Sequence, residues 1–361
     1  MDINQIIVNA KNMRASDVHL VYGLPIKLRI DGSLKNYDEH ILTDDDLNKI
    51  CHDLCNLDLN SIDEYDGART IEDGNLSIRI RLNIFRQQGH FSLAIRILSN
   101  QIPDIDKLGL PQVIKNFAEF NKGIVIITGE TGSGKSTTLA ALLDSINHKR
   151  NEHIITLEDP IEYIYKSDKC VVNQREIGKD TASYDAALKA ILREDPDIIL
   201  IGEVRTRETI EAALSAAETG HLVFCTLHTN SCSETIDRII GFFPADKHEQ
   251  VRMQLSMTLK AVLSQQLLPK IGGGRALATE IMIVNSAIKN LIREGKTPQI
   301  NNTIATTIED GNITMDNCLL KLVKERKITE KTAIESASDK EYVAEHLNYK
   351  ENTNTEMKFF W

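Results

Sequence analysis

From residue 123 onward, short apolar runs alternate with longer segments of helical pattern. The apolar runs are IVIIT, IITLED, DIILIGE and LVFCTLH, which all lie between residues 123 and 228. Short runs rich in β-branched residues and bounded by turn formers are typical of strands buried on both faces. Helical segments between such strands favour a mostly parallel sheet covered by helices. The pattern therefore predicts an α/β core.

The N-terminal part of the chain has a different pattern. A helical segment is followed by the strand-like runs DVHLVYG and IKLRIDGSLK, the second of which bends at Asp31 and Gly32. A second helix is predicted to begin at TDDDLNKICHDLCNL, where Thr43 and Asp46 have the spacing of a capping box. These elements predict a small α+β domain over residues 1–98.

The run LSIRIRLNIF alternates apolar and polar residues with a period of two. This period predicts an antiparallel strand with one wet face, on which we expect Arg79, Arg81 and Asn83. Arg96 is expected on a neighbouring strand within FSLAIRIL.

The chain is divided by changes in composition. Turn formers over residues 99–111 predict a linker, and the predicted core follows over residues 112–270. One long helix is expected over residues 248–268. Beyond Pro269 and three glycines, residues 271–337 are predicted to be mainly helical, and residues 338–361 to form a polar tail.

Composition and charge restrict the kind of protein. The chain has 361 residues, of which 42% are hydrophobic and 26% charged, and its formal net charge is -10. A net acidic chain does not favour nucleic-acid binding, which leaves a basic footprint. Neither a secretory signal nor an apolar run long enough to span a membrane is evident. We therefore expect a cytoplasmic protein without a direct membrane span.

The stretch GETGSGKST directly follows the apolar run IVIIT and matches the P-loop pattern G-x-x-x-x-G-K-[ST]. Glycines let such a loop turn its backbone N–H groups towards phosphate oxygens, and the next helix presents its positive end to the same anion. Lys135 is expected to reach the β- and γ-phosphates of ATP, and the Ser136 hydroxyl to bind Mg²⁺. A purely structural glycine-rich turn is the alternative. The predicted nucleotide-binding residues are Gly129, Glu130, Thr131, Gly132, Ser133, Gly134, Lys135, Ser136 and Thr137.

Two other predicted strands end in carboxylates. IITLED ends in Glu158 and Asp159, and DIILIGE ends in Glu203. The carboxyl ends of parallel strands meet at one edge of a sheet, so these side chains are expected near the P-loop. In nucleotide hydrolysis one acid holds magnesium and another deprotonates the attacking water. Alternatively, such a carboxylate caps the next helix.

His221 and His228 flank the apolar run LVFCTL. We expect both at the edge of the sheet that bears the P-loop, where either could sense the γ-phosphate of ATP. The alternative is that they are ordinary polar residues at a strand end.

Several motifs together resemble those of a known family. They are SDVHL near the start, the P-loop, ITLEDPIEY, LREDPDIILIGEVRTRETI and TGHLVFCTLHTN. From about Ser16 to about Leu320, the chain is similar to the ATPases of type IV pili and type II secretion. Within them it most resembles the pilus retraction ATPases of twitching motility (PilT type), because AIKNLIREGK is close to a signature of that group.

The resemblance implies a role for each matching residue. Glu203 corresponds to an atypical Walker B glutamate that helps hold Mg²⁺, Glu158 to the general base, and His221 and His228 to a histidine box. Arg193 and Arg238 match arginines that act across subunit boundaries, and Arg81 and Arg96 are weaker candidates for that role.

The resemblance also implies a RecA-like P-loop ATPase core with a PAS-like N-terminal domain and a helical C-terminal region. The implied protein is a homo-hexameric, ATP-hydrolysing motor that drives pilus retraction by pilin disassembly. It would dock on an inner-membrane platform protein at the cytoplasmic face. Two alternatives are an ATPase for pilus assembly or type II secretion, and a nucleotide-gated adaptor protein that hydrolyses ATP slowly.

Overall fold

The chain divides into two compact units in the computed structural model. The first comprises residues 1–102 together with residues 158–166, and the second comprises residues 103–157 and 167–361. The structure describes residues 1–30, 32–55, 63–74, 76–98 and 101–348. Four parts of the sequence-based predictions lie outside the described residues: Asp31 of the bend, residues 56–57 at the end of the predicted second helix, residues 99–100 of the linker and residues 349–361 of the tail.

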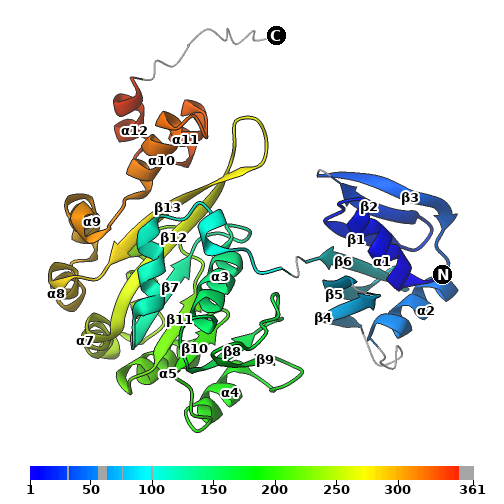
Figure 1. The fold of residues 1–361 in the computed structure, drawn as a ribbon, viewed down its shortest axis with the longest axis horizontal. Helices are drawn as coiled ribbons and strands as arrows, with labels where there is room; N and C mark the ends of the chain where they lie inside the picture. The colour runs from blue at the N-terminus through cyan, green and yellow to red at the C-terminus, as the bar shows by residue number, and fades with distance from the viewer. Residues whose placement is uncertain (31, 56–62, 75, 99–100, 349–361) are drawn as a thin grey trace. The chain divides into compact units, whose positions relative to one another are not determined.

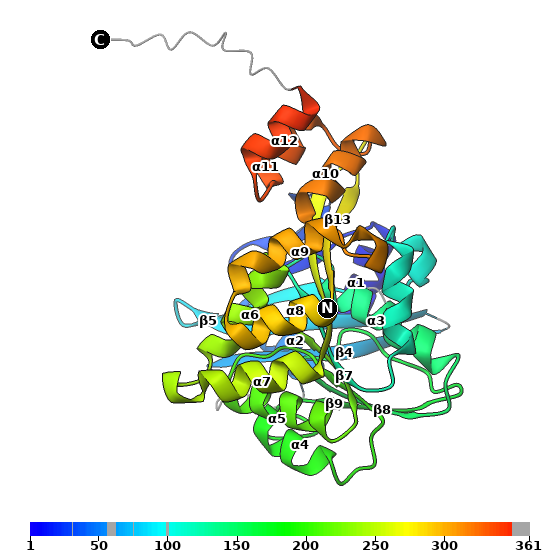
Figure 2. The same cartoon turned by 90° about the vertical axis from the view of Figure 1, so that its left-hand side faces the viewer.

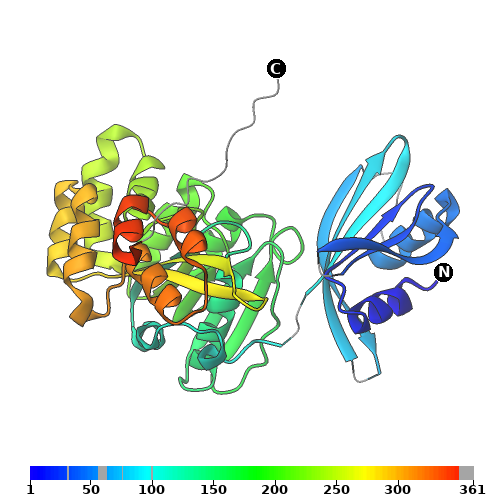
Figure 3. The ribbon, with the colours of Figure 1, turned by 90° about the horizontal axis from the view of Figure 1, so that it is seen from above.

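The first unit is a six-stranded antiparallel sheet that shares one core with two helices (Figures 1 and 3). The strand order is β3-β2-β1-β6-β5-β4. The elements are α1 (Ile3–Asn12), β1 (Asp17–Val21), β2 (Pro25–Ile30), β3 (Ser33–Ile41), α2 (Asp44–Cys55), β4 (Glu64–Asp73), β5 (Leu76–Gln87) and β6 (His90–Ile97).

The predicted capping box at the start of α2 is confirmed. The backbone N–H of Thr43 donates to Asp46 Oδ2 over 3.1 Å, and the backbone N–H of Asp46 donates to Thr43 Oγ1 over 3.3 Å. These two reciprocal bonds satisfy N–H groups that the first turn of a helix would otherwise leave unpaired. They hold the pKa of Asp46 down to about 2, chiefly through the bond from the Thr43 backbone.

The strand β5 differs from expectation at one residue. Arg81 and Asn83 are partly exposed, as predicted, but Arg79 is only 6% exposed. Its Nε and Nη2 atoms donate to the carbonyl oxygen of Ile161 over 3.2 and 3.1 Å. The prediction for Arg79 was wrong because residues 158–166, distant in sequence, belong to the same unit as this strand.

The second unit contains a seven-stranded mixed sheet with the order β13-β12-β7-β11-β10-β8-β9 (Figure 1). Its central strands are parallel, and β12 pairs with β13 in the antiparallel direction. The predicted α/β core is thereby confirmed as an α/β fold. The strands are β7 (Gly123–Thr128), β8 (His153–Glu158), β9 (Val171–Glu176), β10 (Ile198–Ile201), β11 (Leu222–Thr226), β12 (Leu259–Pro269) and β13 (Arg275–Ile283).

Helices pack on both faces of this sheet. α3 lies on one face, and the group from α4 to α9 shares a hydrophobic core with the other (Figure 2). The α-helices of this unit are α3 (Lys135–Asn147), α4 (Tyr184–Ile191), α5 (Arg207–Glu218), α6 (Cys232–Gly241), α7 (His248–Thr258), α8 (Ser286–Glu294), α9 (Ile300–Thr306), α10 (Met315–Lys324), α11 (Glu330–Ser336) and α12 (Lys340–Leu347). Among the described residues, no helix is both long and apolar enough to cross a membrane.

The C-terminal half departs from the predicted elements in three places. The single helix expected over residues 248–268 is wrong, because α7 ends at Thr258 and β12 begins at Leu259. The region expected to be helical from residue 271 begins instead with β13. The expected polar tail contains α12, whose Val343 is fully buried against α10 and α11.

Candidate nucleotide-binding site

The P-loop connects the end of β7 to the start of α3. Gly134 adopts a left-handed conformation (φ +92°) immediately before the helix and offers no side chain to cap its first N–H groups. Gly129 has a φ of +135°, and a Cβ atom there would lie 2.3 Å from the carbonyl oxygen of Gln265. Both positions therefore require glycine. The uncapped start of α3 is suited to an anion.

Lys135 is folded over the loop that precedes it. Its Nζ atom donates to the carbonyl oxygens of Gly129 over 2.7 Å and Glu130 over 3.0 Å, and the side chain is nearly buried. The hydroxyl of Ser133 is buried and has no hydrogen-bond partner among the residues that the structure describes. Ser136, in the first turn of α3, is exposed. A lysine, a buried hydroxyl and a helix start without a side-chain cap fit the phosphates of a nucleotide.

His228 joins the P-loop to Glu203. Its Nδ1 atom lies 3.4 Å from Lys135 Nζ, and its Nε2 atom lies 3.2 Å from Glu203 Oε1. Because a lysine ammonium can only donate, Nδ1 must be the acceptor and the Nε2–H group then donates to Glu203. The predicted grouping of Lys135, Glu203 and His228 at one edge of the sheet is present in the structure.

Arg205 completes the surroundings of Glu203. Its Nη2 atom donates to Glu203 Oε2 over 2.7 Å. Burial alone would raise the pKa of Glu203, but the bond and charge of Arg205, together with His228, hold that pKa below its usual value. Glu203 therefore remains charged in a half-buried position. Sequence reasoning missed Arg205, although its place two residues beyond Glu203 could have suggested it.

Glu158 is the last residue of β8, and β8 pairs with β10 in parallel, with Leu157 opposite Ile201. The strand that leads to Glu203 and the strand that ends in Glu158 are therefore neighbours in the sheet. Glu158 is half-buried and Asp159 is exposed. Both belong to the segment that groups with the first unit.

His221 does not lie at the P-loop edge, so its predicted position was wrong. It immediately precedes β11, and its carbonyl oxygen accepts from the N–H of Gly123 at the start of β7, whereas the P-loop follows the end of β7. A parallel strand rises about 3.3 Å per residue, which separates His221 from His228 by roughly 20 Å along the sheet. The Nδ1 atom of His221 lies 2.9 Å from the carbonyl oxygen of Ala216.

The four arginines named from the sequence occupy different settings. Arg193 is exposed, and within the described residues no acceptor pairs with its guanidinium group. Arg238 is exposed on α6 over the ring of Phe242. The remaining two have carboxylate partners in the first unit, Arg81 with Asp66 at 2.7 Å and Arg96 with Asp17 at 3.0 Å.

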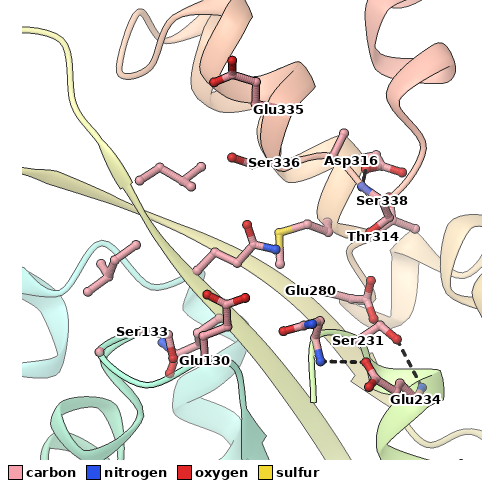
Figure 4. A pocket seen from close by; sticks show the side chains of 18 of the residues that line it. Glu130, Ser133, Ser231, Glu234, Glu280, Thr314, Asp316, Glu335, Ser336 and Ser338 are labelled. Carbon is pink, nitrogen blue, oxygen red and sulfur yellow. Dashed lines mark hydrogen bonds between the residues drawn. The ribbon is translucent and has the colours of Figure 1, made fainter. Parts of the chain in front are cut away.

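A cavity of about 680 Å³ lies beside the tip of the P-loop (Figure 4). Its charged lining residues are all acidic: Glu130, Glu234, Glu280, Asp316 and Glu335. Neither Lys135 nor His228 lines it. A cavity surrounded by carboxylates repels phosphate, so the cradle formed by the P-loop and α3 remains the candidate phosphate site.

A P-loop between a central parallel strand and a helix, with a histidine after the adjacent strand β11 and a carboxylate after the next strand β10, defines a nucleotide-binding protein of the P-loop ATPase class. The chain matches the family model of type II/IV secretion system proteins over residues 1–273. It therefore belongs to that family.

Individual relatives place the chain more closely. It is 43% identical to the type IV pilus retraction ATPase PilT of Pseudomonas aeruginosa over 93% of this chain and 98% of that protein. It is 46% identical to a twitching motility protein of Neisseria gonorrhoeae over 73% of this chain and 71% of that protein. The crystal structure of the pilus retraction motor PilT with bound ADP is 44% identical, with a TM-score of 0.87 over 95% of this chain and 98% of that one. Within the family, the chain is a PilT-type ATPase.

Proposed function

We propose that this chain is the motor of type IV pilus retraction, which hydrolyses ATP to drive pilin disassembly and twitching motility. The observation on which the proposal rests is that His228 joins Lys135 of the P-loop to Glu203. The similarity to retraction ATPases over nearly the whole chain supports retraction as the direction of movement. The proposal includes a RecA-like motor core and a PAS-like N-terminal domain.

In the proposed reaction, Lys135 leaves the carbonyl oxygens of Gly129 and Glu130 for the phosphates of ATP. Glu158 takes a proton from water as the water oxygen forms a bond to the γ-phosphorus. The bond from that phosphorus to the oxygen of ADP breaks, and phosphate departs. His228 is proposed to hold Glu203 in place through its Nε2–H group while charge develops on the phosphate oxygens. Arg193 and Arg238 are proposed to enter the site of a neighbouring subunit.

Magnesium is expected to accompany ATP. Ser136 and Glu203 would hold it, and oxygen ligands of this kind are what the ion prefers. No group of three or more His, Cys, Asp or Glu side chains within the described ranges is arranged to bind a metal. That observation fits an ion that keeps several water ligands and binds with the nucleotide. Bound Mg²⁺ would neutralise charge on the phosphates.

The wider assembly is also a proposal. A homo-hexamer lets one subunit supply an arginine to the next, which makes hydrolysis depend on the position of the neighbour. The ring is proposed to act in the cytoplasm, docked on a membrane-embedded platform protein of the pilus machinery. His221 has no catalytic part in this proposal, because it lies at the far edge of the sheet.

Replacement of two residues separates nucleotide binding from chemistry. We expect Glu158→Gln to bind Mg-ATP and assemble normally but to lose turnover by roughly 100-fold, because an amide cannot take the proton from water. Lys135→Ala should weaken ATP binding itself by about 10-fold or more, because a charge-assisted hydrogen bond is lost. Binding measured by calorimetry and phosphate release measured separately distinguish the two effects. Near-normal hydrolysis by Glu158→Gln would remove Glu158 from the role of base.

The cellular role is tested by deleting the gene and restoring either the wild type or Glu158→Gln. A retraction motor predicts cells with excess surface pili that no longer twitch, and only the wild type should restore movement. Loss of surface pili in the deletion strain would contradict retraction and indicate an assembly ATPase instead.

A further inference from the structure

Thr128 is the last residue of β7 and directly precedes Gly129 of the P-loop. Its side chain is fully buried. Its Oγ1 atom accepts a hydrogen bond from the N–H of Thr229 over 2.8 Å. The same atom lies 2.8 Å from the carbonyl oxygen of Thr229 and 3.2 Å from that of Leu227. One hydroxyl thus contacts a short segment nearly a hundred residues away, on both sides of His228.

The contacts of Thr128 fix the backbone of His228. The carbonyl of Leu227 belongs to the peptide group before His228, and the N–H of Thr229 belongs to the peptide group after it. The Thr128 hydroxyl accepts from the second of these peptide groups and lies within hydrogen-bond distance of the first, so it limits the two backbone dihedral angles of His228. The direction of the His228 Cα–Cβ bond is then set relative to the P-loop. From there the imidazole reaches Lys135 and Glu203.

The hydrogen-bond chain beyond Thr128 has a single consistent direction. Thr235 Oγ1 donates to the carbonyl oxygen of Ser231 over 2.8 Å, so it must accept from Thr229 Oγ1, which lies 2.7 Å away. The proton of Thr229 is therefore used. The proton of Thr128 then goes to an oxygen of Leu227 or Thr229, and every available acceptor belongs to the segment around His228. All three threonines are buried, so water cannot replace these bonds.

We propose that Thr128 is a positioning residue, whose hydroxyl holds His228 between Lys135 and Glu203 for hydrolysis. The inference rests on the proposed ATPase function. Thr128 does not touch the phosphate cradle through its side chain. Its loss should therefore reduce turnover while nucleotide binding is retained.

The test compares substitutions that differ only in the hydroxyl group. Thr128→Val keeps the shape of the side chain, and we expect kcat to fall by about 10- to 100-fold, because small misplacements of a catalytic group have effects of this size. ADP affinity should change by less than about 3-fold. Thr128→Ser, which keeps the hydroxyl, should restore most of the turnover. Thr279→Val is the matched control, because Thr279 is buried in the same sheet and its hydroxyl is within hydrogen-bond distance of the thiol of Cys318, far from His228 in the sequence.

A double-mutant cycle separates positioning from a general loss of stability. If Thr128 acts through His228, then Thr128→Val should cost little further turnover in a His228→Ala background. If the loss of kcat in the double variant equals the product of the losses in the two single variants, the proposal is overturned. A normal kcat in a folded Thr128→Val protein would overturn it as well. If valine prevents folding, then Thr128→Ala is used in the same comparison with Thr128→Ser.

An NMR measurement that does not depend on ATP hydrolysis tests this inference separately from the proposed function. The imidazole NMR signal of His228, assigned by its loss in His228→Ala, should shift in Thr128→Val but not in Thr128→Ser or Thr279→Val. An unchanged signal in Thr128→Val overturns the positioning role even if the enzyme hydrolyses ATP. Absence of ATP hydrolysis in the wild type, with the signal shifted as expected, would instead contradict the proposed function alone.

Discussion

Glu203 stays ionised because of two neighbours that lie close to it. Arg205 donates to one carboxylate oxygen, and His228 lies next to the other. Burial acts in the opposite direction, but the net effect is a pKa below the ordinary value of 4.5 for glutamate. A carboxylate in this state can attract a metal cation without first losing a proton.

Arg205→Ala is expected to raise the pKa of Glu203, because the guanidinium group that favours the charged form is removed. If ionised Glu203 is needed for turnover, the acid limb of the rate profile should move to higher pH. The ionised form also contributes stability above the unfolded pKa near 4.5, and this contribution is lost as the pH falls through the lower folded value. The variant should therefore lose stability at a higher pH than the wild type.

Steady-state rates and thermal unfolding across the acid range measure both effects, with Arg205→Lys as the charge-retaining control. An acid limb that stays in place in Arg205→Ala would show that the rate does not follow the ionisation of Glu203.

The residues predictable from the sequence are those whose place follows from a local motif. The P-loop residues and Glu203 belong to this group, because each directly follows a strand that the apolar pattern reveals. His221 was misplaced for a related reason. His221 and His228 flank one short strand and are close in sequence. The two ends of a strand nevertheless lie at opposite edges of a sheet, so only one of the two histidines can lie beside the P-loop. Arg79 could not be predicted, because its partner Ile161 is distant in sequence.

The boundary between α7 and β12 shows why the type of a whole element could not be predicted from the sequence. Leu255, Leu259 and Val262 are buried and have the spacing of a helical stripe, which favoured one long helix. β12, however, lies between β7 and β13, and residues 261–265 are buried without a break. A strand buried on both faces has no alternation, and periodicity alone cannot distinguish it from a buried helix.

The helix α8 contains most of the segment AIKNLIREGK and has two chemically distinct sides. Ile288 and Ile292 are fully buried and form an apolar side, and the helix packs beside α7 (Figure 2). Arg293 is exposed and Lys289 is partly exposed. Burial of Lys260, together with the charges of Lys289 and Lys122, lowers the pKa of Lys260.

We expect the charge reversals Lys289→Glu and Arg293→Glu to leave the fold and most basal ATPase activity intact, because substitutions of surface charges usually change stability by at most about 0.5 kcal/mol. Pilus retraction should fail, because we propose that the basic edge formed by Lys289, Arg293 and Lys296 contacts a neighbouring subunit or the platform. Twitching, ATPase rate and melting temperature together measure the effect, with Lys331→Glu on α11 as the exposed control. Normal retraction by the double variant would show that the edge only faces solvent.

A single chain brings together several of the residues that are proposed to act in ATP hydrolysis. Lys135, His228 and Glu203 are in contact, whereas Arg193 is exposed and lacks a partner among the described residues. A charged side chain of this kind, if it completes the site of another copy, makes the active unit an interface between subunits. The sequence suggested this arrangement only through family resemblance, because no local pattern in a single chain records what a second copy contributes.

Mixed assemblies can test whether Arg193 acts on a neighbouring subunit. Arg193→Ala and Glu158→Gln should each hydrolyse ATP poorly alone. When the two are mixed, some interfaces pair an intact base with an intact arginine, and we expect turnover above that of either parent, up to roughly a quarter of wild type if subunits mix randomly. A mixture of Glu158→Gln with Lys135→Ala is the matched control. Both substitutions damage the nucleotide site of the chain that carries them, so no site in this mixture has both an intact Lys135 and an intact Glu158. Sedimentation confirms that each preparation assembles. A fully active monomer, or normal turnover by Arg193→Ala alone, would contradict a shared site.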